Sequence, residues 1–526
     1  MGSPTIPTVS ASAAPSQPKP STGGSAAADG FPWRVLLVSS LSAINNMAFG
    51  YDVGVVSGSL ADMATSLALT TFEKEAATSG LNFVAGFGGL YFAGNALDYL
   101  GRRATLMVAS VLLLLGCAVV VFAQSFAVLL LGRALQGLGS GCAWCACSVY
   151  ITEVAPSQYR GALVAISDIA INVGILLGYA ADRAINVSID NADTRWRVAM
   201  AISAAFPAVY MLLYPWMPDT PRWLVMVGRE EQASRTQKWL ANVDDDVAAE
   251  HVGAIAASVR GLRQVRWIDL ADRRVASRWL LFVTLFLGLG QQLTGTEAIL
   301  YYVPSIINEC PEAGLPQPAG CVARSSTFLI NMGVGTCKLV GELLAAFIVE
   351  RAGRRTTLAA SNLLVSVLVF TIALKFLLGW STAVGALSLC LVMFFFSLGP
   401  GPLTWVVVNE MVPLRLRGKL VALSVFFNRL GSGTIALTFL SLKEWVGAFA
   451  AFTLYALLGA VVTAFYWWCV PDLTGKSLEE AESPNDARPS QQPSLEDRSL
   501  LVLAAGPPPG TSPAPADDAA TRGEPL

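Results

Sequence analysis

Twelve separate apolar runs constrain the fold of this chain more than any other feature. A helix that crosses the hydrocarbon core of a bilayer needs about 20 mostly apolar residues. Charged residues make up 14% of the chain, against about 25% in typical soluble domains. We therefore expect an all-α membrane protein with twelve transmembrane helices. The runs that meet the length criterion are 35–59, 79–97, 104–123, 127–151, 161–181, 198–217, 279–303, 326–349, 356–379, 384–410, 418–441 and 448–470.

A polar segment at 218–278 divides these runs into six and six. It contains helical patterns such as REEQASRTQKWL. We expect a six-helix bundle at 33–217, a helical linker at 218–278 and a second six-helix bundle at 279–470. The tails at 1–32 and 471–526 are rich in Ser, Pro and Ala, a composition that cannot bury enough apolar surface to order itself. We expect both tails to be disordered, and the Ser content of the first leaves a plastid transit peptide as an alternative.

Basic residues gather in the connections on one side of the predicted helices. Lys and Arg are enriched in the cytoplasmic loops of membrane proteins. We therefore expect the linker and both termini in the cytoplasm, with the protein in the plasma membrane and a vacuolar or other endomembrane location as the alternative. The basic connections are GRR at 101–103, Arg160, the linker, RAGRR at 351–355 and RLRGK at 415–419.

The opposite connections carry two signs of an outer face. Cys310 and Cys321 bracket the polar loop CPEAGLPQPAGC, where an oxidising compartment would permit a disulfide. The sequon Asn186-Val187-Ser188 also falls on this side, where a glycan can be added.

Two motifs recur in the same order in both halves. Asp98 precedes GRR as Glu350 precedes GRR, 252 residues later, and Glu153 in EVAPSQYRG corresponds to Glu410 in EMVPLRLRG, 257 residues later. Transporters are commonly built from such repeats, with the substrate site near the midplane. We expect the acids and bases of these motifs to bridge neighbouring helices while the cytoplasmic side is closed and to separate when it opens. These gate residues are Asp98, Arg102, Arg103, Glu153, Arg160, Glu350, Arg354, Arg355, Glu410 and Arg417.

The motifs as a set resemble the sugar porter family of the major facilitator superfamily. The resemblance spans residues from about 45 to 480, and it implies the twelve-helix major facilitator fold. Asp219 and Asp472 stand where many family members have Glu. The matching segments are GNALDYLGRR, GRALQGLGSG, YITEVAPSQYRGAL, PDTPRWL, QQLTGTEAILYY, VERAGRR, GPGPLTW and PDLTGKSLEE.

The resemblance also implies sugar contacts. In this family the pair at Gln291 and Gln292 hydrogen-bonds sugar hydroxyls, and Trp405 in GPGPLTW lies against the sugar. Neutral amides and an aromatic face suit a polyhydroxylated ligand. The alternative is that the two glutamines only tie helices together.

Two buried charges resemble the coupling pair of proton-driven family members. Asp52 lies in FGYDVGVVSG, where passive glucose carriers have Asn, and Arg133 lies in LGRALQG. A carboxylate near a movable arginine can bind a proton in one state and release it in another. The alternative is a static salt bridge.

Four more charges distinguish the predicted pocket from the hexose pattern and resemble the plant polyol and monosaccharide transporter branch. They are Asp168, Glu297, Lys338 and Arg429, the last beside a retained Asn428. We expect Lys338 to pair with Glu297 in a charged substrate pocket. The alternative partner is Glu342, which lies one helical turn further along.

Other functional classes have little support in the sequence. His251 is the only histidine, and a net charge of −2 does not favour nucleic acid. Cys142, Cys145 and Cys147 lie in one apolar stretch without the second cluster that a tetrahedral metal site would need. We expect no catalysis, cofactor or metal, and assign these cysteines to packing.

The sequence therefore predicts a proton-coupled symporter of monosaccharides or sugar alcohols that works by alternating access. Its partners would be the small-molecule substrate, the proton and the lipid bilayer, and we expect a monomer. A passive sugar carrier is the first alternative. A transporter-like sugar sensor is the second alternative, although the C-terminal tail of this chain at 471–526 is short for a sensor.

Overall fold

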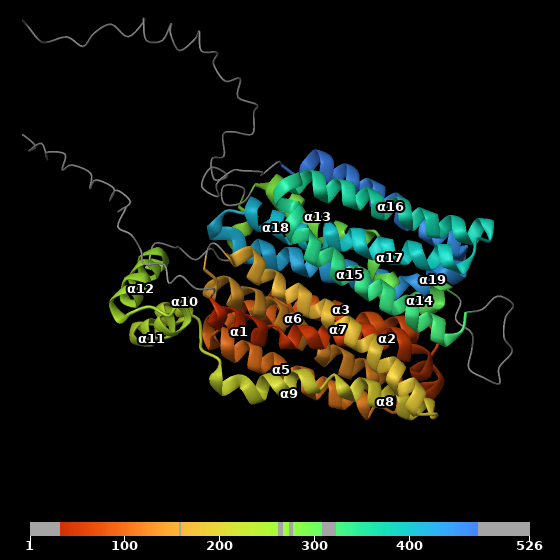
Figure 1. Ribbon diagram of the computed structural model, residues 1–526, viewed down its shortest axis with the longest axis horizontal. Coiled ribbons are helices and arrows are strands. Elements are labelled where there is room, and N and C mark those ends of the chain that lie inside the picture. The colour runs from red at the N-terminus through yellow and green to blue at the C-terminus, as the bar shows by residue number, and fades with distance from the viewer. Residues whose placement is uncertain (1–31, 157–158, 261–266, 273–276, 308–321, 472–526) are drawn as a thin grey trace, which may run out of the picture. The chain divides into compact units, whose positions relative to one another are not determined.

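A computed structural model describes residues 32–156, 159–260, 267–272, 277–307 and 322–471. Within these ranges the chain is built from helices joined by short connections (Figure 1). Cys310, Cys321 and nearly all of both tails lie outside the described residues, so the expectations for them stay predictions.

The first half contains six spans, several of which are assembled from two pieces. The first and second spans are α1 (Trp33–Ser42) with α2 (Ile44–Leu67), and α3 (Thr71–Phe87) with the π-helical η1 (Gly88–Ala93) and α4 (Gly94–Leu100). The next three are α5 (Arg102–Val121), α6 (Phe126–Val154) and α7 (Arg160–Ser188). The sixth is formed by α8 (Ala192–Ile202), α9 (Ala205–Leu213) and η3 (Tyr214–Trp216).

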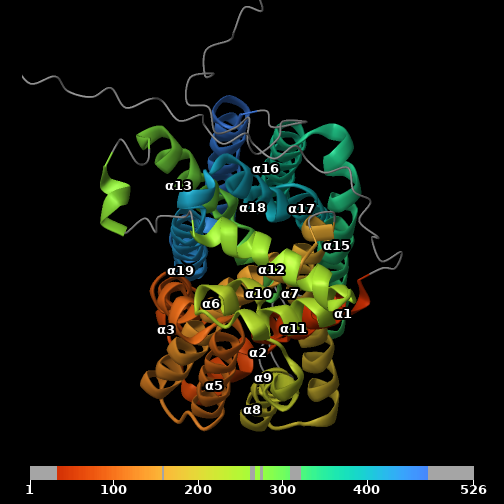
Figure 2. The ribbon, with the colours of Figure 1, turned by 90° about the vertical axis from the view of Figure 1, so that its left-hand side faces the viewer.

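The predicted helical linker contains α10 (Pro221–Met226), α11 (Glu230–Ala241), α12 (Asp245–Arg260) and η4 (Trp267–Ala271). Helices α10, α11 and α12 pack on one another around Trp223, Ala233 and Val252. Figure 2 views the protein from the end where these helices lie. We call this end of the spans the linker side and the opposite end the far side.

The second half contains six more spans. They are α13 (Arg278–Leu293) with α14 (Thr296–Ile307), then α15 (Arg324–Ala352), α16 (Arg354–Leu378), and α17 (Thr382–Leu398) with α18 (Pro400–Met411). The last two spans form the continuous element α19 (Leu414–Cys469), which turns at Gly447, where φ is 83°. The expected fold of twelve spanning helices is confirmed.

Two breaks in the second half shape the centre of the protein. Gly295 separates α13 from α14 with a φ of +76°, and a Cβ there would lie 2.8 Å from the ring of Tyr455. Gly399 separates α17 from α18, directly before Pro400, which begins a helix well. Because both breaks fall mid-membrane, the side chains around them line a cavity rather than lipid.

Glycines allow two spans of the first half to approach closely. A Cβ on Gly50 of α2 would lie 1.9 Å from the carbonyl oxygen of Ile171 on α7, and one on Gly174 of α7 would lie 2.2 Å from that of Met47. Small residues at membrane helix interfaces permit this backbone contact. It holds α2, which carries Asp52, beside α7, which carries Asp168.

One core cluster joins the two halves. It includes Tyr51 and Tyr179 from the first half with Tyr301, Tyr302 and Phe439 from the second. Helix α3 packs along α19, α7 along α15, and α14 against α2. The two halves therefore meet along several helices around a shared centre.

Candidate substrate and proton sites

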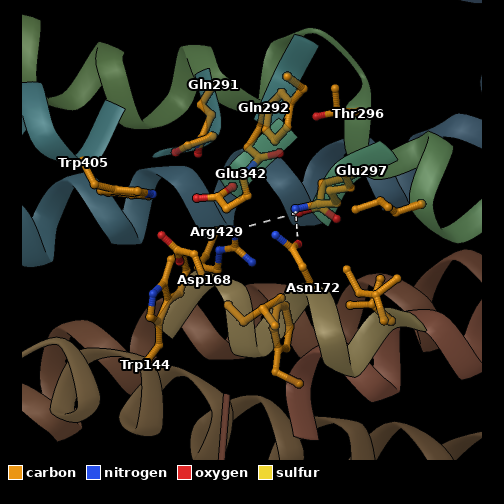
Figure 3. Close-up of a pocket in the computed structure, with 18 residues that line it drawn as sticks. Trp144, Asp168, Asn172, Gln291, Gln292, Thr296, Glu297, Glu342, Trp405 and Arg429 are labelled. Atoms are coloured by element: carbon orange, nitrogen blue, oxygen red, sulfur yellow. Dashed lines mark hydrogen bonds and ion pairs between the residues drawn. The ribbon is translucent and has the colours of Figure 1, made fainter. Parts of the chain in front are cut away.

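A cavity lies between the two halves (Figure 3), and the space in it that is open to the centre of a water-sized sphere is about 90 Å³. Helices α2, α6 and α7 contribute one wall, and α13, α14, α15, α17, α18 and α19 contribute the other. The predicted site residues that line it are Asp168, Gln291, Gln292, Glu297, Lys338, Trp405 and Arg429.

Asn428 does not line the cavity but lies behind the two glutamines, fully buried. Its Nδ2 donates to Gln291 Oε1 at 2.5 Å, and its Oδ1 accepts from Gln292 Nε2 at 3.4 Å. Gln291 Nε2 also donates to the carbonyl oxygens of Pro400 and Gly401, at 2.7 and 2.8 Å. Gln291 thus connects α13 to α18 and α19 and also lines the cavity.

Gln292 has a free acceptor. Its Oε1 is buried and has no hydrogen-bond partner among the described residues. An unpaired buried oxygen is costly, on the order of 1–3 kcal/mol. Gln292 is therefore the better placed of the two glutamines to accept a hydrogen bond from a ligand hydroxyl.

The charged residues pair differently from the sequence expectation. Glu297 Oε1 lies 3.9 Å from Nη2 of Arg429, whereas Lys338 Nζ donates to Asn172 Oδ1 at 2.6 Å. Arg429 Nη2 also donates to Asn428 Oδ1 at 2.7 Å. The break at Gly295 places Glu297 in the first turn of α14, from which it reaches α19. The expected Glu297–Lys338 pair is therefore wrong for this conformation, and the partner of Glu297 is Arg429.

Trp144 on α6 is a pocket residue that the sequence analysis missed. The guanidinium of Arg429 lies 4.7 Å from the centre of its ring, and the ring of Trp405 meets it edge to face at 5.6 Å. Figure 3 shows both indoles at the same end of the cavity. A lone Trp within GCAWCACSVY was the available signal. Trp144 therefore provides an aromatic surface in the cavity from the first half. Arg429, on α19 of the second half, has no aromatic ring to provide one.

Asn172 and Glu342 also line the cavity without having been assigned to it from the sequence. Asn172 lies one turn beyond Asp168 on α7, the spacing at which two side chains share a helix face. Glu342 lies one turn beyond Lys338 on α15 in the same way. That spacing was the signal available for both residues.

Asp52 and Arg133 form an isolated ion pair in the first half. Arg133 Nη1 donates to Asp52 Oδ1 at 2.5 Å, and the two residues are only 1% and 3% exposed, respectively. Arg133 also donates to the carbonyl oxygen of Ala77 at 2.9 Å and to Gln136 Oε1 at 3.2 Å. Both members of so buried a pair must be present, because removing one of them destabilises the protein by about 3–5 kcal/mol.

The described gate residues lie at the linker side and form contacts within each half. Arg102 Nη2 donates to Glu153 Oε1 at 2.7 Å, and Arg354 Nη2 donates to Glu410 Oε1 at 2.9 Å. Arg417 donates to the carbonyl oxygen of Val412 at 3.3 Å. These bonds join helices of the same half rather than the two halves to each other.

The remaining gate residues have other surroundings. Arg103 lies over the ring of Tyr214 at 4.0 Å and Arg355 over that of Trp467 at 5.0 Å. The side chains of Asp98 and Arg160 are exposed, and the side chain of Glu350 lies outside the described part of the chain.

Asp219 belongs to the same network at the linker side. Its carboxylate accepts a hydrogen bond from the backbone N–H of Arg103 at 3.2 Å. Burial raises the pKa of Asp219 above its usual range.

Hydrogen bonds between the halves occur in the middle and at the far side. In the middle, Asn82 Nδ2 donates to Tyr301 Oη at 3.2 Å and Tyr179 Oη donates to the carbonyl oxygen of Leu300 at 3.3 Å. At the far side, Glu75 on α3 accepts from the backbone N–H of Ser441 at 2.8 Å. The conformation is therefore closed at the far side.

The sequon and the cysteines have definite positions. Asn186 lies in the last turn of α7, where its Nδ2 donates to the carbonyl oxygen of Asp182 at 2.8 Å, and its glycosylation stays a prediction. Cys142 and Cys147 are fully buried and Cys145 is partly buried. They pack on α6 as ordinary small apolar side chains.

Twelve spans in two halves around a central cavity with charged and amide side chains have the major facilitator fold and the architecture of a membrane transport protein. Residues 38–483 match the family model described as Sugar (and other) transporter, so the chain belongs to this family.

Named relatives agree with this assignment. Probable polyol transporter 4 of Arabidopsis thaliana is 33% identical over 457 residues, which cover 85% of this chain and 84% of the relative. The glucose transporter GlcP of Staphylococcus epidermidis is 27% identical, covering 85% of this chain and 96% of the relative. A structure of the proton:xylose symporter XylE bound to 6-bromo-6-deoxy-D-glucose has a TM-score of 0.71 at 24% identity, over 86% of this chain and 98% of that one. The latter similarity shows the shared fold.

Proposed function

We propose that this protein is a symporter that moves sugars or sugar alcohols with a proton by alternating access. The observation that carries the proposal is the polar cavity between the two halves, accompanied by a buried Asp52–Arg133 pair that does not line it. Such a central site can be exposed to each side in turn as the halves rock. The names of the relatives, polyol transporter and proton:xylose symporter, support the same substrate class and coupling ion.

The lining of the cavity favours arrays of hydroxyls. Gln292 and Trp405 provide an amide and an aromatic face, and Asp168, Glu297 and Lys338 provide charged partners. Charge-assisted hydrogen bonds are roughly twice as strong as neutral ones. Because each charged group can bind a single hydroxyl firmly, the site depends less on a flat pyranose ring. A polyol or inositol is therefore a substrate or competitor alongside monosaccharides.

Proton coupling depends on the Asp52–Arg133 pair. In this conformation Arg133 Nη1 donates to Asp52 Oδ1 at 2.5 Å. When rearrangement of the halves withdraws the arginine, Asp52 takes up the proton that is carried with the substrate. A passive carrier, in which the pair is only structural, is the alternative.

We propose that the linker side is the cytoplasmic side, since the basic connections lie there. Both termini are then cytoplasmic, and the conformation described above is closed to the outside. The protein works as a monomer in the plasma membrane, and it carries out transport rather than catalysis.

The bundles at 33–217 and 279–470 are the units that move against each other around the linker at 218–278. On this proposal the gate residues stabilise each half at its cytoplasmic end. They include Arg102 with Glu153 and Arg354 with Glu410, which bridge neighbouring helices in the present conformation.

Uptake by a sugar-transport-deficient cell tests the proposal. Labelled glucose uptake is measured with and without a protonophore, and against tenfold excesses of sorbitol, mannitol, xylitol and inositol. We expect accumulation that collapses with the protonophore and competition by at least one polyol or by inositol. Uptake that is insensitive to the protonophore would support the passive carrier, and competition by hexoses alone would reject the polyol specificity. A sugar response without uptake would indicate a sensor.

A further inference from the structure

Three polar atoms near the Asp52–Arg133 pair lack partners. They are Asp52 Oδ2, Arg133 Nη2 and Ser140 Oγ, which are buried and have no hydrogen bond within the described part of the chain. The other oxygen of Asp52 is already bound to Arg133. Buried polar groups are nearly always paired, often with an internal water molecule.

A small cavity adjoins these atoms. It is lined by Asp52, Gln136, Ser140 and Ser203 among apolar neighbours, and the space open to the centre of a water-sized sphere is about 10 Å³. That volume suits about one water molecule, which needs two to four polar partners. Asp52 and Ser140 each offer an unpaired oxygen, and Gln136 offers an amide. The cavity therefore meets both the size and the polarity requirement.

A second small cavity continues toward the substrate site. Its lining includes Ser140, Trp144 and Arg429. The space open to the centre of a water-sized sphere is again about 10 Å³. Ser140 lines both small cavities, while Trp144 and Arg429 line both the second cavity and the central one. Phe49 lines all three. The shared lining residues place the three cavities next to one another between Asp52 and the substrate site, with Ser140 between the first two.

We propose that the cavity beside Asp52 binds one water molecule, and that Ser140 links it to the central cavity, so that protons reach Asp52 through the substrate site. The proposal rests on the proton symport proposed above and specifies its route.

In each transfer, a hydronium ion in the central cavity gives a proton to Ser140 Oγ and is left as water, and Ser140 passes its own hydrogen to the bound water. That water passes one hydrogen to Asp52 Oδ2. The carboxylate becomes a carboxylic acid, while the serine and the water end with their original composition. Release follows the reverse order.

Ser140 acts as a positioning and relay residue rather than a substrate contact. The charged or titratable groups with an electrostatic influence on Asp52 come from four elements: Arg133 on α6, Cys117 on α5, Tyr301 on α14, and Tyr51, which precedes Asp52 on α2. None of these groups is altered by a change of the Ser140 hydroxyl. A changed pH profile in a Ser140 variant therefore reports on the route rather than on the local charges.

The experiment compares Ser140→Ala, which removes the hydroxyl, with Ser140→Thr, which keeps it. Ser57→Ala is the matched control, because Ser57 is also buried with an unpaired Oγ but lines none of the three cavities. Each variant is reconstituted in vesicles with an imposed pH gradient. The measurements are the initial rate of proton-driven uptake, the pH profile of that rate, and the substrate affinity from tryptophan fluorescence.

We expect Ser140→Ala to slow proton-driven uptake at least tenfold with affinity within twofold of wild type. Ser140→Thr and Ser57→Ala should each keep more than half the rate. A wild-type rate and pH profile in Ser140→Ala would overturn the route, as would a parallel loss of affinity. Should Ser140→Ala fail to reach the membrane, Ser140→Gly makes the same comparison. If wild-type uptake does not depend on the pH gradient, the symport proposal itself fails. That outcome differs from a failure of the route through Ser140, in which only the Ser140 variants disagree with expectation.

Discussion

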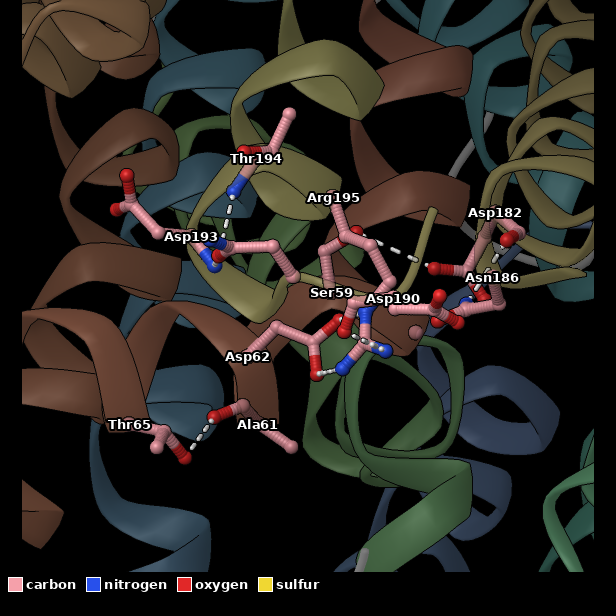
Figure 4. A network of polar contacts seen from close by, with 12 residues as sticks. Ser59, Ala61, Asp62, Thr65, Asp182, Asn186, Asp190, Asp193, Thr194 and Arg195 are labelled. Atoms are coloured by element: carbon pink, nitrogen blue, oxygen red, sulfur yellow. Dashed lines mark hydrogen bonds and ion pairs between the residues drawn. The ribbon is translucent and has the colours of Figure 1, made fainter. Parts of the chain in front are cut away.

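Arg324, in the first turn of α15, donates from Nη2 to Oδ2 of Asp62 on α2 at 3.3 Å and so joins the two halves at the far side. Asp62 is also held by Arg195 of its own half, at 2.9 and 3.0 Å (Figure 4). The carboxylate is almost fully buried between the two arginines. Because Arg195 stays with Asp62 whichever way the halves move, Arg324 is the partner that opening must release.

Replacing Arg324 with Gln should favour opening at the far side, since it removes this link and leaves the Asp62–Arg195 pair in place. Arg324 is partly exposed, so we expect a shift of at most about 1 kcal/mol, or about fivefold. The measurement is labelling of a Cys placed at Thr327, which is buried near Arg324, by a membrane-impermeant thiol reagent.

Arg197→Gln is the matched control, because Arg197 pairs with Asp193 at 3.0 Å within the same half and at the same side. Its labelling should equal that of the parent. Equal labelling in Arg324→Gln would show that the link does not hold the far side closed.

Asp52→Asn should abolish accumulation against a gradient while exchange of substrate continues. The amide keeps a hydrogen-bond acceptor for Arg133 but cannot bind and release a proton near neutral pH. Counterflow and accumulation in vesicles measure the two activities separately. Accumulation by the Asn variant with an unchanged pH dependence would contradict the role of Asp52.

Lys338→Asn should lower kcat/KM for uptake at least tenfold, because it removes the bond from Nζ to Asn172 and a positive charge from a pocket with several acids. Truncating one partner of a buried polar contact typically costs about 1–3 kcal/mol. Lys238→Asn, an exposed linker residue paired with Asp245, is the control and should transport normally. Equal kcat/KM in the two variants would remove Lys338 from the site.

Trp144→Ala should raise KM about tenfold, whereas Trp144→Phe should have a smaller effect because it keeps an aromatic face. Loss of the indole removes apolar contact area and the surface beneath the Arg429 guanidinium. Trp380→Ala, in the connection between α16 and α17, is the control. Concentration series of uptake give KM, and an unchanged KM in Trp144→Ala would exclude substrate contact.

Cys310 and Cys321, which lie outside the described residues, are expected to form a disulfide. Closing a loop of about ten residues would stabilise the folded protein by about 2–3 kcal/mol on the chain-entropy model. Mass spectrometry of non-reduced peptides from native membranes should recover the linked pair. Full alkylation of both thiols without prior reduction would disprove it.

Hydrophobic length predicted where each span lies but not where each helix begins. The second span was expected from 79, yet α3 begins at Thr71, where a capping box joins Thr70 and Glu73. The sixth was expected from 198, yet α8 begins at Ala192, where Asn191 accepts from the N–H of Asp193. The polar residues at these helix starts do not meet the criterion of an apolar run. They still belong to the helix, because the capping side chains accept hydrogen bonds from the free N–H groups of its first turn.

The sequence by itself determined the number of spans, the two halves, the family and seven of the residues that meet in the cavity. These follow from it because bilayer thickness sets helix length, and because the repeated motifs mark equivalent positions. Only the tertiary structure decided which charge pairs with which, that Trp144 joins the pocket, and that the far side is closed. Contacts such as Glu297–Arg429 depend on the break at Gly295 and on how helices of opposite halves face each other. The energy of a charge pair falls with the distance between its atoms, and no linear spacing specifies that distance across two halves.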